Sequence, residues 1–153
     1  MRARVETQNL ASPHAQRVIK YRRRKDMQWK KKFFVCNHCK NMIGFIDNKG
    51  VPLMCCGAKM TELEPNTVEA SQEKHLPAVT VSGNSINVQI GSVAHPMEDA
   101  HNISFVFVET ERGGQRKNLK PGETPKVTFS FADDKPIAVY AYCNLHGLWK
   151  TEV

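Results

Sequence analysis

The chain has 153 residues, of which 41% are hydrophobic and 24% are charged, a composition typical of a soluble globular protein and not of a disordered one. No stretch approaches the roughly 18 consecutive apolar residues of a membrane-spanning helix, and no apolar segment near the N-terminus indicates a secretion signal. The net charge of +7 is concentrated at the start, because residues 1–26 hold eight Lys or Arg against Glu6 and Asp26 and so carry +6. The remaining chain is nearly neutral, so nucleic acid is not an expected partner.

Residues 1–32 are the first of three predicted regions, and residues 21–25 are their densest run of charge. Short polar segments of this kind usually remain mobile unless a partner orders them, so the sequence predicts a basic, disordered leader. Two alternatives stay open. In the first alternative, the leader is an arm that binds nucleic acid or a membrane surface. In the second, translation begins at Met27, which would remove most of the positive charge.

Residues 33–64 form the second region, a small module that contains Cys36, Cys39, Cys55 and Cys56. Four thiolates satisfy a tetrahedral metal ion, and the Cys-x-x-Cys pair brings two sulfurs to one point. Neighbouring side chains in an extended chain point apart, so at Cys55–Cys56 the backbone must curl, which Gly57 would ease. We therefore predict a distorted metal site, which the spacing alone leaves open between iron and zinc, with buried or disulfide-bonded cysteines as the structural alternative.

The same region carries further predictions. Asp47-Asn48-Lys49-Gly50 is typical of a hairpin turn, and His38, between two ligands, is expected to be exposed. A module of this length cannot bury enough apolar surface to fold alone. A metal or a partner must therefore contribute to its stability. Five cysteines cannot pair completely, and their crowding indicates metal thiolates in a reducing, cytoplasmic compartment.

Residues 65–153 are predicted to be all-β. Five runs show alternation or enrichment in β-branched residues, namely residues 79–81, 85–90, 103–108, 126–131 and 137–142. Gly, Pro, Asn and Asp turns separate these runs, and no stretch has a helical period. Several short strands in about 90 residues indicate an antiparallel β-sandwich of immunoglobulin type.

Four histidines and the last cysteine lie in this third region: His75, His95, His101, His146 and Cys143. Four imidazoles and one thiolate are too many donors for a closed tetrahedral site, but they suit an iron with five protein ligands and one open position. A thiolate opposite that position would donate electron density to whatever binds there, as axial thiolates do in haem proteins. The pattern favours redox chemistry on a bound ligand.

Taken together, these motifs closely resemble desulfoferrodoxin, the two-iron superoxide reductase family. The resemblance covers residues 33–153 with no motif missing, and rests on the four module cysteines, Glu73-Lys74-His75, His95-Pro96-Met97, His101 and Cys143-Asn144-Leu145-His146-Gly147. It implies a desulforedoxin-like module followed by an immunoglobulin-like sandwich. The implied cofactors are two mononuclear irons, one held by Cys36, Cys39, Cys55 and Cys56, and one by His75, His95, His101, His146 and an axial Cys143.

The resemblance also implies the reaction, a one-electron reduction of superoxide to hydrogen peroxide without release of dioxygen. Lys74 would attract superoxide and help to deliver a proton, and Glu73 would close the sixth position of the resting ferric iron. In an extended loop these two neighbours would face opposite ways. The implied partners are a rubredoxin-like electron donor and a second copy of the chain, in the cytoplasm of an anaerobic or microaerophilic prokaryote.

Two other functions are compatible with parts of the sequence. A β-sandwich that ends in Cys143 and His146 is similar to blue-copper electron carriers, but no Met follows His146 and there are too many histidines. A zinc-ribbon binding module with a basic leader would explain residues 1–60, but it would leave the four histidines without a role.

Overall fold

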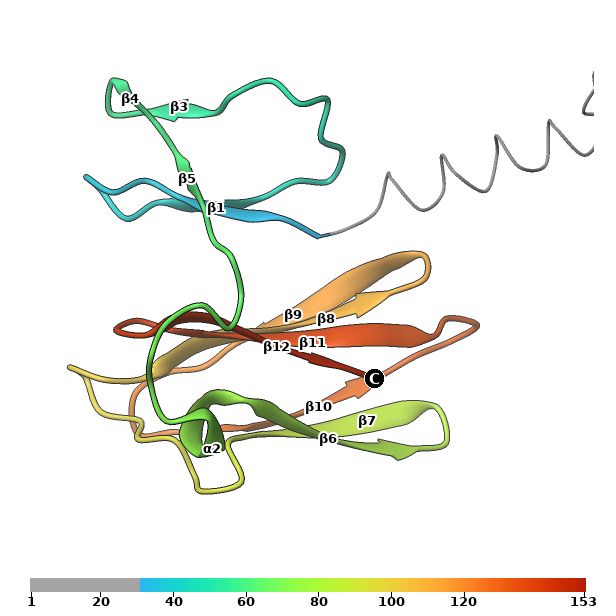
Figure 1. The fold of residues 1–153 in the computed structure, drawn as a ribbon. Helices are drawn as coiled ribbons and strands as arrows, with labels where there is room; N and C mark the ends of the chain where they lie inside the picture. Colours follow the sequence, from blue (N-terminus) through green and yellow to red (C-terminus); the bar gives the residue numbers. More distant parts are fainter. Residues whose placement is uncertain (1–30) are drawn as a thin grey trace, which may run out of the picture.

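The computed structural model describes residues 31–153, so the predicted leader lies almost entirely outside the described residues. One helical turn and twelve strands make up the described part (Figure 1). They are β1 (Phe33–Val35), β2 (Met42–Gly44), β3 (Met54–Cys55), β4 (Ala58–Lys59), β5 (Thr61–Glu62), α2 (Gln72–His75), β6 (Pro77–Ser82), β7 (Ser85–Ile90), β8 (Ile103–Thr110), β9 (Gly113–Asn118), β10 (Lys126–Ser130), β11 (Pro136–Cys143) and β12 (Gly147–Glu152).

Two antiparallel sheets form a sandwich, with strand orders β12-β11-β8-β9 and β10-β7-β6. Alternate residues of β7 and β11 point into the space between the sheets, where Ile86, Val88 and Val139 are almost fully buried. The period of two in these strands thus becomes one apolar layer. Cys143 belongs to this layer, so its sulfur lies at the end of a rigid core strand.

The four-stranded sheet is buried on its other face as well. Phe105, Phe107 and Tyr140 point away from the sandwich core and pack against Phe33 of β1, with ring centroids 5.5–5.8 Å from that of Phe33. This explains why β8 reads as a nearly continuous apolar run, because a strand covered on both faces needs apolar residues at every position. The small module of residues 33–64 therefore lies against the outer face of the sandwich (Figure 1).

The module is built from two small sheets, β2-β1-β5 and β3-β4. The chain bends at Asp47 and Gly50, and the Gly50 N–H donates to the Asn48 side chain, Oδ1, at 2.7 Å, but residues 47–50 do not form the predicted hydrogen-bonded backbone turn. The hairpin expected around it was wrong, because β2 pairs with β1 and β3 pairs with β4. The cysteine-bearing turns, and not the Asn-Lys-Gly segment, connect the paired strands.

The all-β prediction is confirmed, with three local differences. Strand β9 was missed because all six of its residues are exposed and so show no alternation, and β12 was missed because its glycine and charged residues obscure the pattern. The expected absence of helix was wrong for α2, a single turn too short to show a helical period. No helix among the described residues is long and apolar enough to cross a membrane.

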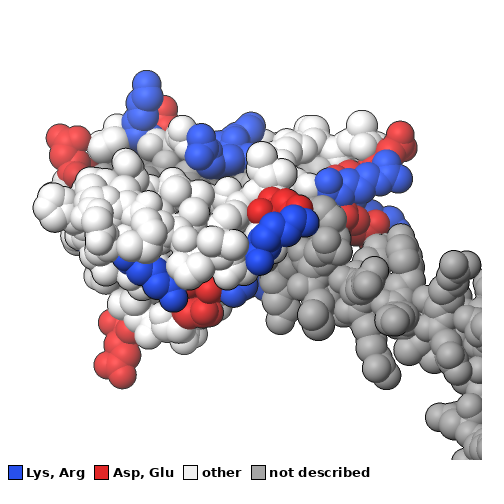
Figure 2. Space-filling model, turned by 90° about the horizontal axis from the view of Figure 1, so that it is seen from above, with Lys and Arg blue, Asp and Glu red and all other residues white. Residues whose placement is uncertain are grey.

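Charge is dispersed over the module side of the molecule. Figure 2 shows basic and acidic side chains scattered over this face, without a continuous basic surface. Nothing on the visible face therefore resembles the basic stripe typical of a nucleic-acid-binding domain.

Candidate metal centres

Two tight turns carry the four module cysteines. In the first, between β1 and β2, the Cys39 N–H points at Cys36 Sγ at 3.5 Å and the Lys40 N–H donates to the Cys36 carbonyl at 2.9 Å. In the second, Cys56 and Gly57 are the two central residues of the β3–β4 hairpin, with φ of 50° and 76°. Positive φ at both positions is the type I′ geometry. This is how adjacent cysteines direct their sulfurs to one point, with Gly57 in the role expected of it.

The four sulfurs lie within 4.8 Å of one another. Cys39 Sγ is 3.6 Å from Cys55 Sγ, and Cys55 Sγ is 3.9 Å from Cys56 Sγ. Metal–sulfur bonds of about 2.3 Å in a regular tetrahedron place the sulfurs about 3.8 Å apart, so the spacing fits one tetrahedral ion. All four cysteines are free, so the disulfide alternative was wrong. His38 is exposed, as expected, and lies outside the group.

The thiols also compete for protons. The Cys39 N–H lowers the pKa of Cys36 to about 6, whereas the hydrogen bond with Cys39 raises the pKa of Cys56 to about 12. Four sulfurs this close cannot all be thiolates without a cation among them, because their charges repel. The donor set thus fits a metal ion, which would remove this conflict.

The second group collects donors from three separate places. His75 ends α2, His95 and His101 lie in the connection between β7 and β8, and Cys143 and His146 lie in and after the end of β11. One ligand atom from each of the five residues lies within 4.8 Å of the others. The five residues that the sequence suggested as one site are therefore together in space.

The imidazole rings form a square. Neighbouring ring centroids are 4.6–4.9 Å apart around the order His75, His95, His101, His146, and the diagonal from His75 to His101 is 6.2 Å. Neighbouring rings are inclined by 76–84°, so each presents an edge to the centre. This is the arrangement expected of four imidazoles in one plane around an ion.

Backbone acceptors decide which nitrogen faces the centre. His75 Nδ1–H donates to the Ser71 carbonyl at 2.7 Å, and His95 Nδ1–H donates to the Pro96 carbonyl at 2.6 Å. Each Nε2 is then the unprotonated nitrogen, as a metal ligand must be. Nε2 of His95 and of His101 are buried without a hydrogen-bond partner among the described residues, which is the expected state of a donor that awaits an ion.

His146 differs from the other three because its Nδ1 faces the centre. This atom lies 2.9 Å from His75 Nε2 and 3.6 Å from Cys143 Sγ. Metal–nitrogen bonds of about 2.1 Å place two neighbouring equatorial nitrogens about 3.0 Å apart, close to the spacing here. The His146 N–H also points back at Cys143 Sγ at 3.4 Å, so the turn after β11 positions both ligands.

Burial disfavours protonation of three of the imidazoles. It lowers the pKa of His95 to about 4 and also lowers the pKa of His75 and of His101. The positive charge of Lys74 acts in the same direction on His75 and His101, so its field reaches the site. Burial raises the pKa of the Cys143 thiol. Neutral imidazoles are ready to bind a metal, whereas the thiol needs the ion to ionise.

Two residues that position the ligands were not found from the sequence. The Trp149 ring stacks on His75, with centroids 4.8 Å apart, and its Nε1–H donates to the His146 carbonyl at 3.1 Å. Gly91, with φ of 80°, lies so close to α2 that a Cβ there would be 2.6 Å from the Lys74 carbonyl oxygen. A tryptophan near the last ligand and a glycine after β7 were visible in the sequence, but their contacts with α2 are not local.

Glu73 and Lys74 are both exposed, immediately before the buried His75. The expected extended loop was wrong, because both residues lie in the helical turn α2. Successive residues of a helix differ by about 100° in direction and not 180°. The Glu73 carbonyl accepts from the Val93 N–H at 3.1 Å and from the Ser92 hydroxyl at 3.3 Å, which anchors the turn to the loop after β7.

Comparisons with known proteins agree with this geometry. The family model described as Desulfoferrodoxin matches residues 67–152. A desulfoferrodoxin homologue from Archaeoglobus fulgidus is 39% identical over 118 residues, which are 77% of this chain and 94% of the relative. The desulfoferrodoxin of Nitratidesulfovibrio vulgaris is 39% identical over 119 residues, covering 78% and 94% of the two chains.

A solved structure extends the comparison to the fold. The crystal structure of the superoxide reductase from Treponema pallidum superposes with a TM-score of 0.69 at 35% identity, covering 81% of this chain and all of that one. The alignment therefore spans both the module and the sandwich. The predicted iron cofactors are confirmed, since the four-cysteine group and the four-histidine, one-cysteine group match the two iron sites expected of these proteins. The chain belongs to the desulfoferrodoxin family.

Proposed function

We propose that this protein is a superoxide reductase, which adds one electron and two protons to superoxide and forms hydrogen peroxide without releasing dioxygen. The observation that carries the proposal is the square of four inward-facing imidazoles with the Cys143 sulfur beside it. Five donors leave one position of a six-coordinate ion for a small ligand. The oxidoreductases named among the comparisons support the same class of enzyme.

The residues that would hold the catalytic iron are His75, His95 and His101 through Nε2, His146 through Nδ1, and Cys143 through its thiolate. When bound, iron supplies the electron, and the thiolate favours its release because it is the strongest electron donor of the set. The protein keeps the imidazoles in place through the Nδ1–H bonds of His75 and His95 to backbone carbonyls. Such outer contacts set the orientation and basicity of the ligands.

Lys74 attracts the substrate. Its ammonium group is exposed on the turn that ends at His75, and its charge acts on two of the site's imidazoles. A cation beside the site raises the local concentration of a small anion and its rate of association. Glu73, exposed on the same turn, would supply a carboxylate ligand to the oxidised iron, and Lys74 would help to deliver a proton to the product.

The remaining regions serve this reaction. Residues 33–64 form the desulforedoxin-like module, whose tetrathiolate iron relays electrons, and residues 65–153 form the catalytic sandwich. A rubredoxin-like carrier supplies the electrons. Ile46, Val51 and Met54 are 92%, 71% and 64% exposed on the module, which supports a homodimer. Five free cysteines support a reducing compartment, the cytoplasm of an anaerobic or microaerophilic prokaryote.

The test starts from metal analysis of anaerobically purified protein. We expect two irons per chain, with one absorption pattern typical of an iron tetrathiolate and a second, thiolate-to-iron band that appears only on oxidation. One zinc and no iron would refute the proposal. Cys36→Ser should remove the first pattern and leave the second, which tests whether the two centres assemble independently.

Superoxide kinetics then test the role of Lys74. Lys74→Ala should slow the second-order reaction of the reduced protein with superoxide and weaken its dependence on ionic strength, with the iron content unchanged. The matched control is Lys126→Ala, which removes an exposed lysine from β10, the edge strand of the sheet β10-β7-β6. Equal rates in the two variants would remove Lys74 from the mechanism.

A further inference from the structure

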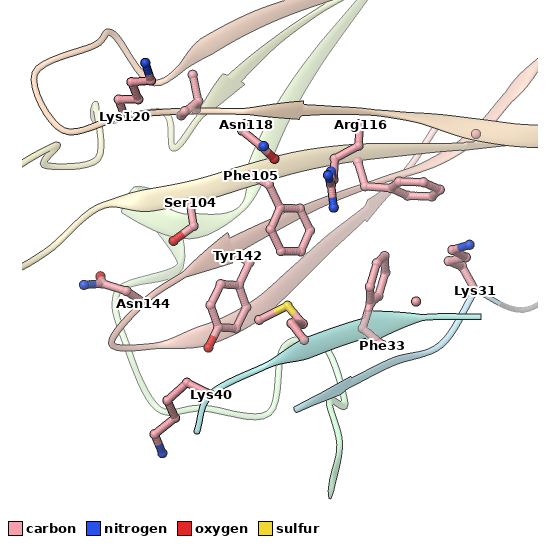
Figure 3. A pocket seen from close by; sticks show the side chains of 15 residues that line it. Lys31, Phe33, Lys40, Ser104, Phe105, Arg116, Asn118, Lys120, Tyr142 and Asn144 are labelled. Carbon is pink, nitrogen blue, oxygen red and sulfur yellow. The ribbon is translucent and has the colours of Figure 1, made fainter. Parts of the chain in front are cut away.

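A second concave site lies between the module and the sandwich, away from the five-donor group. It is an open groove of about 940 Å³, bounded by β1 and β2 on one side and by β8, β9 and the end of β11 on the other (Figure 3). Clefts between two packed parts of a chain are a preferred place for small ligands, and this volume is within the usual range for them. The metal chemistry described above does not use this groove.

The floor of the groove is aromatic. Phe33, Phe105 and Phe107 are each at most 9% exposed, and Tyr142 is half-buried beside them with its ring stacked on Phe105 at 5.7 Å. Gly114 opens the space over Phe107, since a Cβ there would be 2.3 Å from the end of that ring. The phenylalanine rings pack on one another, so the partly exposed Tyr142 ring is the aromatic surface of the floor that a planar ligand can contact.

The rim of the groove is cationic. Lys31 and Lys40 come from the module, and Arg116 and Lys120 come from β9 and the connection that follows it (Figure 3). No carboxylate is among the described residues that line the groove, and none of the ion pairs between described residues involves these four side chains. Lys31 is already engaged, because its ammonium group donates to the Phe45 carbonyl at 2.7 Å and lies 5.2 Å from the centre of the Phe107 ring. In a chain whose remaining part is nearly neutral, the three other cations around one cleft, Lys40, Arg116 and Lys120, are a local feature and not a consequence of the net charge.

We propose that this groove binds a planar aromatic anion, a molecule with a flat ring system and a phosphate or carboxylate group. The ring system lies against Tyr142, and the anionic group lies against the β9 side of the rim, along which Arg116 and Lys120 are spaced (Figure 3). A guanidinium binds phosphate or carboxylate oxygens through paired hydrogen bonds. Residues 1–26 do not complement this rim, because they carry a net charge of +6 themselves.

The test measures the binding of flavin mononucleotide to the full-length protein at low salt, with quenching of flavin fluorescence as the signal. Riboflavin has the same ring system without the phosphate, so it isolates the contribution of the rim. We expect flavin mononucleotide to bind at least tenfold more tightly than riboflavin, and Arg116→Gln and Lys120→Gln each to weaken its binding by about tenfold. Lys126→Gln, an exposed lysine of the other sheet, should change nothing.

Three results would overturn the proposal. They are equal affinities for the two flavins, unchanged binding in both rim variants, and binding that falls equally in the Lys126→Gln control. Light scattering on the same samples adds a further outcome, since loss of a dimer in Arg116→Gln without any flavin binding would assign the groove to contact between copies of the chain. The readout needs neither iron nor superoxide, so failure here leaves the proposed reductase activity untouched.

Discussion

The close packing of Gly91 against α2 determines the position of His75, a ligand of the five-donor site. An alanine Cβ at residue 91 would lie 2.3 Å from the Val93 carbonyl oxygen, 2.6 Å from that of Lys74 and 2.8 Å from that of Glu73. Close carbon–oxygen contacts are about 3.3 Å, so α2 would have to move away by about 0.7 Å, and the loop after β7 would have to open by about 1 Å at Val93. Since α2 ends at His75, this movement would displace a metal ligand.

The cost of Gly91→Ala has two parts. A φ of 80° costs a residue with a Cβ about 1–2 kcal/mol, and the overlap with three backbone oxygens adds about 1–3 kcal/mol. Gly122→Ala separates these parts, because Gly122 has a φ of 83° but no atom within 4 Å of its missing Cβ. We therefore expect Gly122→Ala to lower the free energy of unfolding by about 1–2 kcal/mol and Gly91→Ala to lower it by about 2–5 kcal/mol.

Urea unfolding of the anaerobic protein, followed by far-UV circular dichroism, measures both variants. Iron content after dialysis against a weak chelator measures the centre. Gly91→Ala should lose the iron of the five-donor site and keep that of the four cysteines, whereas Gly122→Ala should keep both. Equal destabilisation in the two variants, with both irons retained, would show that the close contact of α2 with Gly91 does not position His75.

Four further substitutions test other contacts. Cys143→Ser should abolish superoxide reduction and the thiolate-to-iron band; full activity would refute the five-donor site. Glu73→Ala should leave reduction largely intact but change the spectrum of the oxidised protein, so an identical spectrum would argue against ligation by Glu73. Trp149→Phe loses the hydrogen bond to the His146 carbonyl and part of the stack on His75, and chelator competition should show about tenfold weaker iron binding; unchanged affinity would show that the stack is dispensable. Tyr140→Phe removes the hydroxyl that donates to the buried Glu109 at 2.8 Å, so urea unfolding should show a loss of about 1–3 kcal/mol, against little change in Tyr142→Phe.

Much of the site was readable from the sequence because metal donors are chemically distinctive. Cys36, Cys39, Cys55 and Cys56 are close in the chain, so local turns alone bring them together, as the type I′ turn at Cys56–Gly57 shows. The other five donors were grouped by their number and by the family resemblance. The structure places their ligand atoms within 4.8 Å of one another.

Some strands of the sandwich were also predictable from the sequence, and others were not. β7 has an apolar residue at every second position, so its period of two is visible in the sequence. β11 is apolar or aromatic throughout, because both of its faces are covered. β9 has no buried residue and takes its place only by pairing with β8, from Phe105↔Asn118 to Thr110↔Gly113. Pairing of an exposed edge strand depends on backbone hydrogen bonds to a neighbour, which leave no mark on side-chain pattern.

The sequence by itself determined the identity and order of the donors, the all-β class and the turns at the cysteines, because each follows from residue type or local backbone geometry. Only the tertiary structure decided which nitrogen of each histidine faces the centre, that Trp149 stacks on His75, that Gly91 sets the position of α2, and that Phe33 closes an aromatic groove against β8. Those features depend on residues far apart in the chain, and their contacts exist only once the sheets have packed.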